Sequence, residues 1–355
     1  MTVQAVQGLA PETRSAGAPW AATVARYKRS NDLKAAWQIA NTFVPYIALW
    51  WLMYLSLALP YWVTLLLAIP AAGLRMRIFI IQHDCGHHSF LTNKVANDLL
   101  GTICGAVTLT PYRLWKRTHS RHHASSGNLE HRGHGDVSTL TVAEYLQRSK
   151  WGRLRYRIYR HPLVLFVFGA SYLFIIRQRF TLGIPRTWKV ERRSVHLTNL
   201  GIALLWGCGV CIFGAQSFFL VELPTVVLGA ALGSWLFYIQ HQYEDAYWQP
   251  HRTWSFNDSA LDGSSYYRLP RVLQWFSGNI GFHHIHHLNS RIPNYHLHAC
   301  YSAEPAFREG VTFGVRESLT CASWKLWDET TQRMVTFADV DLRRPQQDAD
   351  VQRTA

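Results

Sequence analysis

The stretch Phe282-His283-His284-Ile285-His286-His287 contains four histidines in six residues, and two similar clusters precede it in the chain. These are His83-Asp84-Cys85-Gly86-His87-His88 and His119-Ser120-Arg121-His122-His123. Their spacing is His-x-x-x-His-His once and His-x-x-His-His twice. On a helix, positions i, i+3 and i+4 lie on one face, so the histidines of each cluster can converge on one object. Three clusters with such spacing are hard to explain by chance.

The clusters have the chemistry of metal ligands. Imidazole is the commonest metal ligand in proteins and adds no negative charge to a site. His284 would point away from its neighbours on a helix, which leaves nine histidines, too many for one ion, so two ions are expected. A structural zinc ion would be closed by four ligands, commonly with cysteines among them. Cys85 does not recur in the other clusters and is better explained as a small packed side chain.

The three motifs HDCGHH, HSRHH and HHIHH resemble those of the integral-membrane fatty-acid desaturases, across roughly residues 27 to 337. The likeness is greatest to the acyl-lipid type that introduces an omega-6 (delta-12) double bond. This resemblance implies a cis-desaturation that uses dioxygen, two external electrons and two iron ions. It implies an acyl-lipid substrate held in a tunnel beneath the metals. No side-chain nucleophile or carboxylate pair is required, and none is evident in the sequence.

The composition agrees with a membrane enzyme. The 355 residues are 48% hydrophobic and carry a formal net charge of +14. The charge lies between apolar blocks, which favours lipid headgroups and membrane topology, and not nucleic acid, as its cause. Six cysteines without a disulfide pattern indicate a reduced, cytoplasm-facing protein.

Four apolar blocks predict transmembrane helices, each near the length of about 20 residues that a membrane crossing needs. They cover about 43–59, 62–81, 197–220 and 224–240. We expect two hairpins, with turns at Pro60-Tyr61 and at residues 221–223. Arg75 and Arg77 are costly in lipid, so the second helix is expected to leave the hydrocarbon near them. The predicted fold is all-α and integral to the membrane, with a cytosolic helical cap that carries the histidine clusters.

The distribution of charge predicts the orientation of the chain. Residues 113–193 contain 17 Lys and Arg against four Asp and Glu, which places this segment in the cytoplasm. Basic residues from Arg26 to Lys34 favour a cytoplasmic N-terminus as well. Leu99–Thr110 is too short to cross and is predicted to be re-entrant or interfacial, which keeps the first two clusters on one side. Leu163–Ile176 is predicted to lie in the interface. The expected location is the bacterial inner membrane, with both termini and the active site cytoplasmic.

The resemblance also implies a set of metal ligands. His83 and His87 form the firmer pair of the first cluster, while His88 belongs to the motif as a ligand or as an outer contact. His241 follows the fourth apolar block and matches a further histidine that the family places between its second and third motifs. Asp84, Glu244 and Asp245 are candidates to accept the second N–H of ligating imidazoles. The metal ligands predicted in this way are His83, His87, His88, His119, His122, His123, His241, His283, His286 and His287.

The remaining segments complete the predicted domain organisation. Residues 1–25 are expected to form a mobile cytosolic arm, 26–342 the membrane desaturase domain, and 343–355 a disordered tail. Val311–Leu326 is compatible with a helix docked on the cap. The sequence contains no His-Pro-Gly-Gly haem motif. Electrons are therefore expected from a separate, ferredoxin-like carrier.

Two other functions use the same features. A relative with the same motifs hydroxylates an alkyl chain, a carotenoid or a sterol, and product analysis distinguishes it from a desaturase. A membrane metal transporter is the alternative from another class. Transport sites usually lie near the middle of the bilayer on interrupted helices, whereas these clusters follow helix ends on one side. The sequence favours the enzyme.

Overall fold

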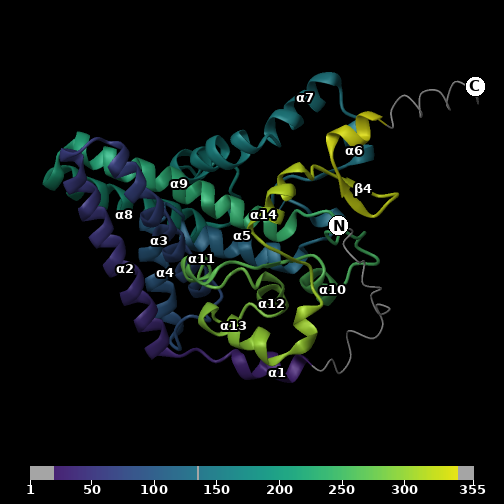
Figure 1. The fold of residues 1–355 in the computed structure, drawn as a ribbon, viewed down its shortest axis with the longest axis horizontal. Coiled ribbons are helices and arrows are strands. Elements are labelled where there is room, and N and C mark those ends of the chain that lie inside the picture. Colours follow the sequence, from purple (N-terminus) through teal and green to yellow (C-terminus); the bar gives the residue numbers. More distant parts are fainter. Residues whose placement is uncertain (1–19, 134–135, 343–355) are drawn as a thin grey trace, which may run out of the picture.

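The structure, a computed structural model, describes residues 20–133 and 136–342, and four of its helices are long and apolar enough to cross a membrane. They are α2 (Asp32–Leu55, extended to Ala58 by the 3₁₀ turn η2, Ser56–Ala58), α3 (Trp62–Gly86), α8 (Lys189–Phe213) and α9 (Ala215–His241). They stand together on one side of the molecule, and the histidine-bearing cap lies on the other (Figure 1). The predicted all-α membrane fold is confirmed.

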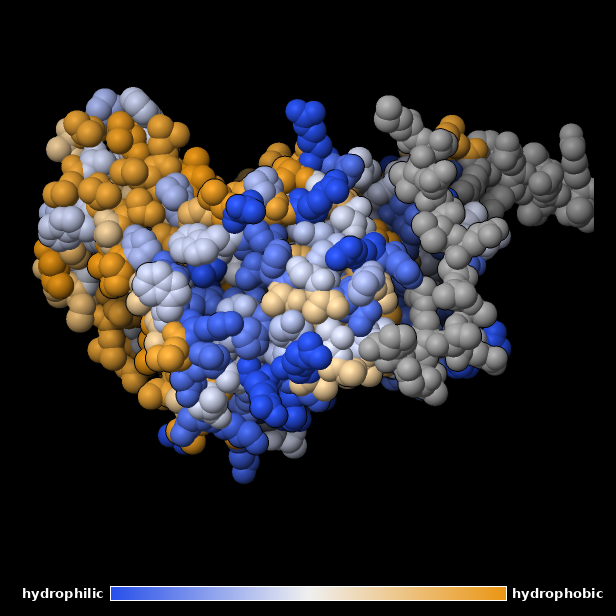
Figure 2. Space-filling model, turned by 60° about the horizontal axis from the view of Figure 1, so that its bottom comes forward, coloured by the Kyte–Doolittle hydropathy of each residue, from blue (hydrophilic) through white to orange (hydrophobic). Residues whose placement is uncertain are grey.

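The surface divides in the same way. Apolar residues cover the side formed by the long helices, and hydrophilic residues predominate over the cap (Figure 2). The exposed apolar side chains on this side include Trp37, Ile47, Leu66, Leu204 and Ile212. Such a continuous apolar surface is characteristic of a membrane-facing region.

The first hairpin joins α2 and α3. Helix α2 begins earlier than predicted because the Asn31 side chain accepts the backbone N–H of Lys34 and caps the helix. Helix α3 continues five residues beyond the predicted end, to Gly86, so the first histidine cluster begins inside it.

The second hairpin turns at a different place from the one predicted. Helix α8 ends at Phe213, and α9 begins at Ala215, with Gly214 between them at φ 78° and ψ 148°. Glycine adopts this backbone conformation readily because it has no side chain. The residues predicted as the turn, 221–223, lie inside α9. Glu222 had suggested an exposed turn, but it is buried and paired inside the protein.

The sequence had suggested that α3 leaves the hydrocarbon near Arg75 and Arg77, and the structure shows where these two side chains lie. Both side chains are buried among neighbouring helices, at 5% and 6% exposure. Arg75 Nη2 lies 2.5 Å from Glu222 Oε1 and donates to the Tyr46 hydroxyl at 2.6 Å. This internal network offsets the cost of burying the Arg75 charge.

Shorter helices connect the hairpins. Helices α4 (Lys94–Val107) and α5 (Tyr112–Ser125) follow the first hairpin, and α4 packs on α3 and α8. Helix α7 (Lys150–Tyr159) meets the helical stretch Leu163–Arg179 at a bend of 64°. This stretch contains the π-helical turns η4 (Leu163–Gly169) and η5 (Tyr172–Ile176) and the 3₁₀ turn η6 (Arg177–Arg179).

The cap is mainly helical, with two very small sheets. The strands are β1 (Leu140–Thr141), β2 (Tyr266–Tyr267), β3 (Thr312–Phe313), β4 (Leu326–Asp328) and β5 (Arg333–Val335). The three-stranded sheet has the order β1-β4-β5, with Leu140 opposite Leu326 and Leu326 opposite Val335. In the two-stranded sheet, Tyr266 of β2 lies opposite Thr312 of β3. The remaining helices are α1 (Trp20–Tyr27), α6 (Val142–Leu146), α10 (Phe256–Leu261), α11 (Arg271–Phe276), α12 (His283–Leu288), α13 (Asn294–Ala303) and α14 (Val315–Ser318), with the 3₁₀ turns η3 (Leu129–His131), η7 (Pro305–Arg308) and η8 (Leu319–Ser323).

The predictions for residues 311–326 and for the two terminal segments can be compared with the structure. The predicted helix over 311–326 is wrong, because β3, α14, η8 and the start of β4 divide this segment. Of the predicted N-terminal arm, residues 1–19 lie outside the described residues, and residues 20–25 belong to α1, which packs on α13. The predicted tail 343–355 also lies outside them.

Candidate metal centre

The first histidine cluster lies at the C-terminal end of α3. His83 occupies the last turn of this helix and His87 is its C-cap, so the i, i+4 spacing brings their rings to 4.9 Å between centroids. His88 leaves the helix with φ 54°, and its side chain points elsewhere. Its Nε2 lies 3.0 Å from Asp98 Oδ1 and 2.7 Å from Lys116 Nζ.

The second and third clusters lie on α5 and α12. His119, His122 and His123 are on the last two turns of α5, and His283, His286 and His287 are on the short helix α12. His241 is the last residue of α9, so the end of a long helix delivers it to the same region.

The histidines form two groups, in each of which one nitrogen per residue lies within 4.8 Å of the others. Imidazole nitrogens about 2 Å from one ion lie no more than about 4 Å apart, so this spacing is close to that of a ligand sphere. Group one is His83, His87, His119, His123 and His286, and group two is His122, His241, His283 and His287. Each of α5 and α12 contributes to both groups, so the groups are adjacent.

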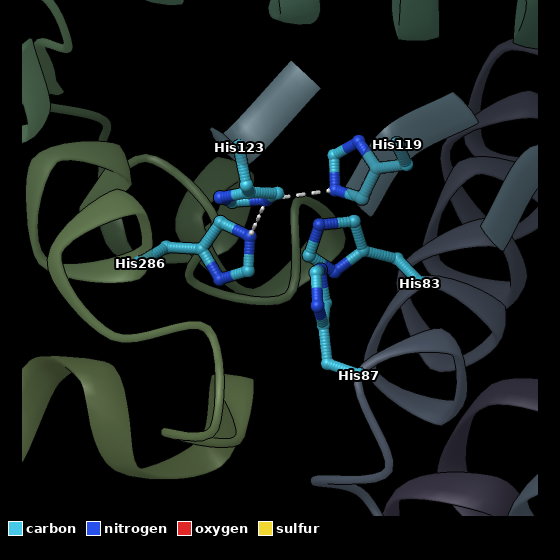
Figure 3. Close-up of side chains that lie close together, drawn as sticks. All are labelled: His83, His87, His119, His123 and His286. Carbon is cyan, nitrogen blue, oxygen red and sulfur yellow. Dashed lines mark hydrogen bonds between the residues drawn. The ribbon is translucent and has the colours of Figure 1, made fainter. Parts of the chain in front are cut away.

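The Nε2 atoms of these rings crowd together. His123 Nε2 lies 3.0 Å from His119 Nε2 and 3.1 Å from His286 Nε2, as Figure 3 shows for group one. In group two, His241 Nε2 lies 3.1 Å from His122 Nε2 and 3.0 Å from His283 Nε2. A neutral imidazole has one donor and one acceptor nitrogen, so a single Nε2 atom cannot satisfy two such neighbours at once.

Several outward nitrogens have polar partners. His83 Nδ1 lies 3.0 Å from Asp84 Oδ1, and His241 Nδ1 donates to the carbonyl of Gly263 at 3.0 Å. His122 Nδ1 contacts Asp136 Oδ1. Such contacts fix the orientation of an imidazole and leave Nε2 free as a ligand.

The sequence had identified Asp84 as such a partner but not Asp136. Glu244 and Asp245, the other carboxylates proposed from the sequence, both face Arg333 and lie outside the two groups. Asp136 lies 13 residues beyond the second cluster, and no local spacing connects it with His122. Only the folding of the segment after α5 brings them together.

Burial favours the neutral form of the imidazoles. It lowers the pKa of His119, His123 and His286 well below the usual value for histidine, and the neighbouring imidazoles lower it further. The pKa of His283 and of His287 is lowered for the same two reasons. Neutral imidazoles are ready to bind a metal at neutral pH without first losing a proton.

The residues present fit a pair of metal ions. The Nε2 atoms of His83, His87 and His287 are buried and have no hydrogen-bond partner among the described residues. A buried nitrogen without a partner is costly, and a bound cation would satisfy it. Nine imidazole nitrogens in two groups are the ligand chemistry of a divalent first-row metal such as iron or zinc.

Of the ten histidines predicted as ligands, His88 lies outside both groups. His284 also lies outside, as predicted, and its Nε2 lies 3.1 Å from the carbonyl of Phe307. Neither group includes His131, His161, His196, His251, His296 or His298, and His134 lies outside the described residues.

Comparison with known proteins places the chain among lipid-modifying enzymes. The fatty acid desaturase family profile matches residues 58–315. A fatty acid desaturase of Bacillus subtilis (strain 168) is 43% identical over 314 residues, 88% of this chain and 89% of the relative. An sn-1 oleoyl-lipid 12-desaturase of Synechocystis sp. is 27% identical over 63% of each chain. A chloroplastic sn-2 acyl-lipid omega-3 desaturase (ferredoxin) of Helianthus annuus is 26% identical over 64% of this chain and 52% of the relative.

Proposed function

The chain belongs to the fatty acid desaturase family, and we propose that it introduces a cis double bond at the omega-6 (delta-12) position of a lipid-linked acyl chain. The observation that carries this proposal is the pair of histidine groups, in which nine imidazoles from four helices converge. The name of the Synechocystis relative, an oleoyl-lipid 12-desaturase, supports the position and the lipid-linked substrate.

Two iron ions are the proposed cofactor. Group one would hold one ion through five histidines, and group two would hold the other through four. When bound, a di-iron centre supplies an oxidant strong enough for an unactivated methylene: the acyl chain loses two hydrogens, and dioxygen, with two electrons and two protons, becomes two waters.

The side chains of this protein supply position and environment. Every histidine of the two groups except His87 is at most 9% exposed. Burial excludes bulk water from the reacting atoms and protects a strong oxidant from side reactions. Imidazole ligands would leave the positive charge of bound metal ions largely uncompensated, except where Asp84 and Asp136 approach.

The proposed location is the bacterial inner membrane, with the histidine groups and both termini on the cytoplasmic side. The proposal takes the four long apolar helices as the crossings and the bent pair of α7 and Leu163–Arg179, which is the one further candidate span among the described residues, as lying in the interface. An even number of crossings returns the chain to the side where it began. The basic segment 113–193 supports the cytoplasmic side for the cap. A separate ferredoxin-like carrier is the proposed electron donor, and the name of the Helianthus relative supports it.

The test is the fatty acid profile of a bacterial host that is supplied with oleate and a ferredoxin system and expresses the protein. Wild type is compared with His286→Ala, which removes a group-one nitrogen, and with His298→Ala, which removes an exposed histidine of α13. We expect a new diunsaturated acid with wild type and His298→Ala but not with His286→Ala. Mass spectrometry of the derivatised double bonds then gives their position.

Two results would contradict the proposal. A hydroxylated acid in place of the diunsaturated one would identify a hydroxylase that uses the same centre. An unchanged profile from folded, iron-loaded protein with a working electron donor would exclude oleoyl chains as the substrate.

A further inference from the structure

His122 occupies a special position among the α5 histidines. His119 and His123 belong to group one, whereas His122 belongs to group two. The His122 ring stands almost perpendicular to those of His241 and His287, at interplanar angles of 80° and 88°. Its Nε2 lies 3.1 Å from His241 Nε2, so the edge of the ring that carries Nε2 faces group two.

The opposite edge of this ring meets a carboxylate. His122 Nδ1 contacts Asp136 Oδ1, and the two side chains are 1% and 14% exposed. Asp136 also lines a small cavity with His241, Gln242 and Trp248. The carboxylate therefore reaches group two from outside, through the one α5 histidine that belongs to that group.

Arg132, four residues before Asp136, makes several hydrogen bonds with neighbouring parts of the chain. The Arg132 guanidinium donates to the carbonyl of Leu129 at 2.6 Å and to that of Thr139 at 2.8 Å. It also forms two contacts with the Glu144 carboxylate, at 2.6 and 2.9 Å. Arg132 thus connects Leu129 and Thr139, which lie on either side of Asp136 in the sequence, to Glu144 in the first turn of α6.

We propose that Asp136 is a positioning residue for the metal of group two. Its carboxylate accepts the Nδ1–H of His122, which selects the tautomer whose Nε2 lone pair faces the ion and fixes the plane of the ring. It also places one negative charge beside four neutral ligands. The inference rests on the proposed function, because it requires that group two binds iron.

Group one also contains a histidine whose Nδ1 contacts a carboxylate, but this carboxylate lies on a different element. Asp84 contacts His83 Nδ1 at 3.0 Å, and its other oxygen accepts the backbone N–H and the side-chain N–H of Asn294, at 2.6 and 2.8 Å. Asp84 lies within α3, whereas Asp136 lies in the connection between α5 and α6. The two carboxylates therefore act on different metals, and a change at Asp136 leaves the group-one contact in place.

The experiment measures iron in purified full-length protein, with Asp136→Asn and Asp136→Ala beside wild type. Replacing a residue that orients a ligand typically weakens metal binding about 10- to 100-fold. At an iron concentration that just saturates wild type, we expect two ions per wild-type chain and close to one per variant chain. Asp136→Glu keeps a carboxylate and is expected to recover part of the second ion.

The control is Asp245→Asn, which removes an exposed carboxylate that contacts Arg333. It is expected to keep two ions. Mössbauer spectra give a second measurement, because iron in group one and iron in group two have different numbers of nitrogen ligands. The Asp136 variants should lose one of two quadrupole doublets, and the same doublet in both variants.

The outcomes separate the two proposals. Two ions bound with wild-type affinity in Asp136→Ala would overturn the role of Asp136, as would an equal loss from both groups in a folded variant. If wild type itself binds no iron, the proposed function fails before the variants are compared. Asp136→Asn, which keeps the size of the side chain, covers the case in which Asp136→Ala does not fold.

Discussion

Lys325 is a cation enclosed in the cap. Its side chain is 8% exposed, and its Nζ donates to the carbonyl of Arg160 at 2.7 Å. Arg160 is itself fully buried. Burial and, to a smaller extent, the positive charge of Arg160 together lower the pKa of Lys325 to about 8. The folded protein therefore releases this proton more easily than the unfolded chain does.

This difference predicts a pH dependence of stability. Between about pH 8 and the usual lysine pKa, the unfolded chain keeps the proton that the folded protein has released, so the free energy of unfolding rises with pH. The gain is at most about 3 kcal/mol. We expect the unfolding midpoint of wild type to rise from pH 7.5 to pH 10 relative to that of Lys325→Met, measured in detergent. Parallel curves for the two proteins would contradict the assignment.

Single residues also show where sequence reasoning stops. The spacing of the histidines was sufficient to select eight of the nine residues that form the two groups, because helical periodicity decides which side chains share a face. The ninth, His241, was predicted from the family resemblance. It could not exclude His88, since that depends on the positive φ with which the chain leaves α3. Nor could it find Asp136, whose contact with His122 depends on a long connection and on no periodic pattern.

At the scale of elements, the pair of Arg75 and Glu222 connects the two hairpins. Arg75 of α3 and Glu222 of α9 are both buried, and Glu222 Oε2 also accepts the indole N–H of Trp50 on α2 at 3.2 Å. Arg75 Nη1 donates to the carbonyl of Val107, the last residue of α4, at 2.7 Å. This ion pair and its hydrogen bonds thus connect four helices, α2, α3, α4 and α9.

Breaking this pair from one side should be more harmful than removing it. Glu222→Leu leaves the Arg75 charge buried without its carboxylate, which typically costs about 3–5 kcal/mol. In the double variant Arg75→Met, Glu222→Leu no charge remains to be compensated, and we expect most of that stability to return. Thermal unfolding of wild type, both single variants and the double variant measures the coupling. A double variant that is no more stable than Glu222→Leu would argue against a buried pair.

The same pair explains an error in the predicted elements. A break with an acidic residue, Glu222, between two apolar blocks indicated a turn at 221–223, whereas these residues lie inside α9. A charge inside an apolar block has two explanations, a turn outside the membrane or a partner inside the protein. Only the position of Arg75, far away in the sequence, distinguishes them. The actual turn, at Gly214, left a weaker sequence signal because one glycine among many is not distinctive.

At the scale of the whole molecule, the two histidine groups connect both hairpins to the cap. Helix α3 contributes to group one, α9 to group two, and α5 and α12 to both. The all-α membrane architecture was predictable because the length of the apolar blocks and the distribution of charge are signals that extend over many residues. The small sheets of the cap were not predictable, since strands of two or three residues are too short to show a period.

Because the proposed ligands come from these separate elements, we expect removal of the metals to lower the stability of the whole molecule. A ligand present at about 100 times its dissociation constant stabilises the folded state by about 2.7 kcal/mol, so two ions contribute about 5 kcal/mol. For a chain of this size we expect the unfolding midpoint to fall by at least about 5 °C when a chelator and a reductant remove the iron.

Restoring different metals separates stability from activity. Iron(II) should recover both the unfolding midpoint and desaturation, whereas zinc, which also binds imidazole but has no redox chemistry, should recover only the midpoint. His286→Ala, which lacks a group-one nitrogen, should recover less of the midpoint with either metal. An unchanged midpoint in wild type, after metal analysis has shown that the iron is gone, would mean that the hairpins and the cap are held together by packing and by contacts such as the Arg75–Glu222 pair alone.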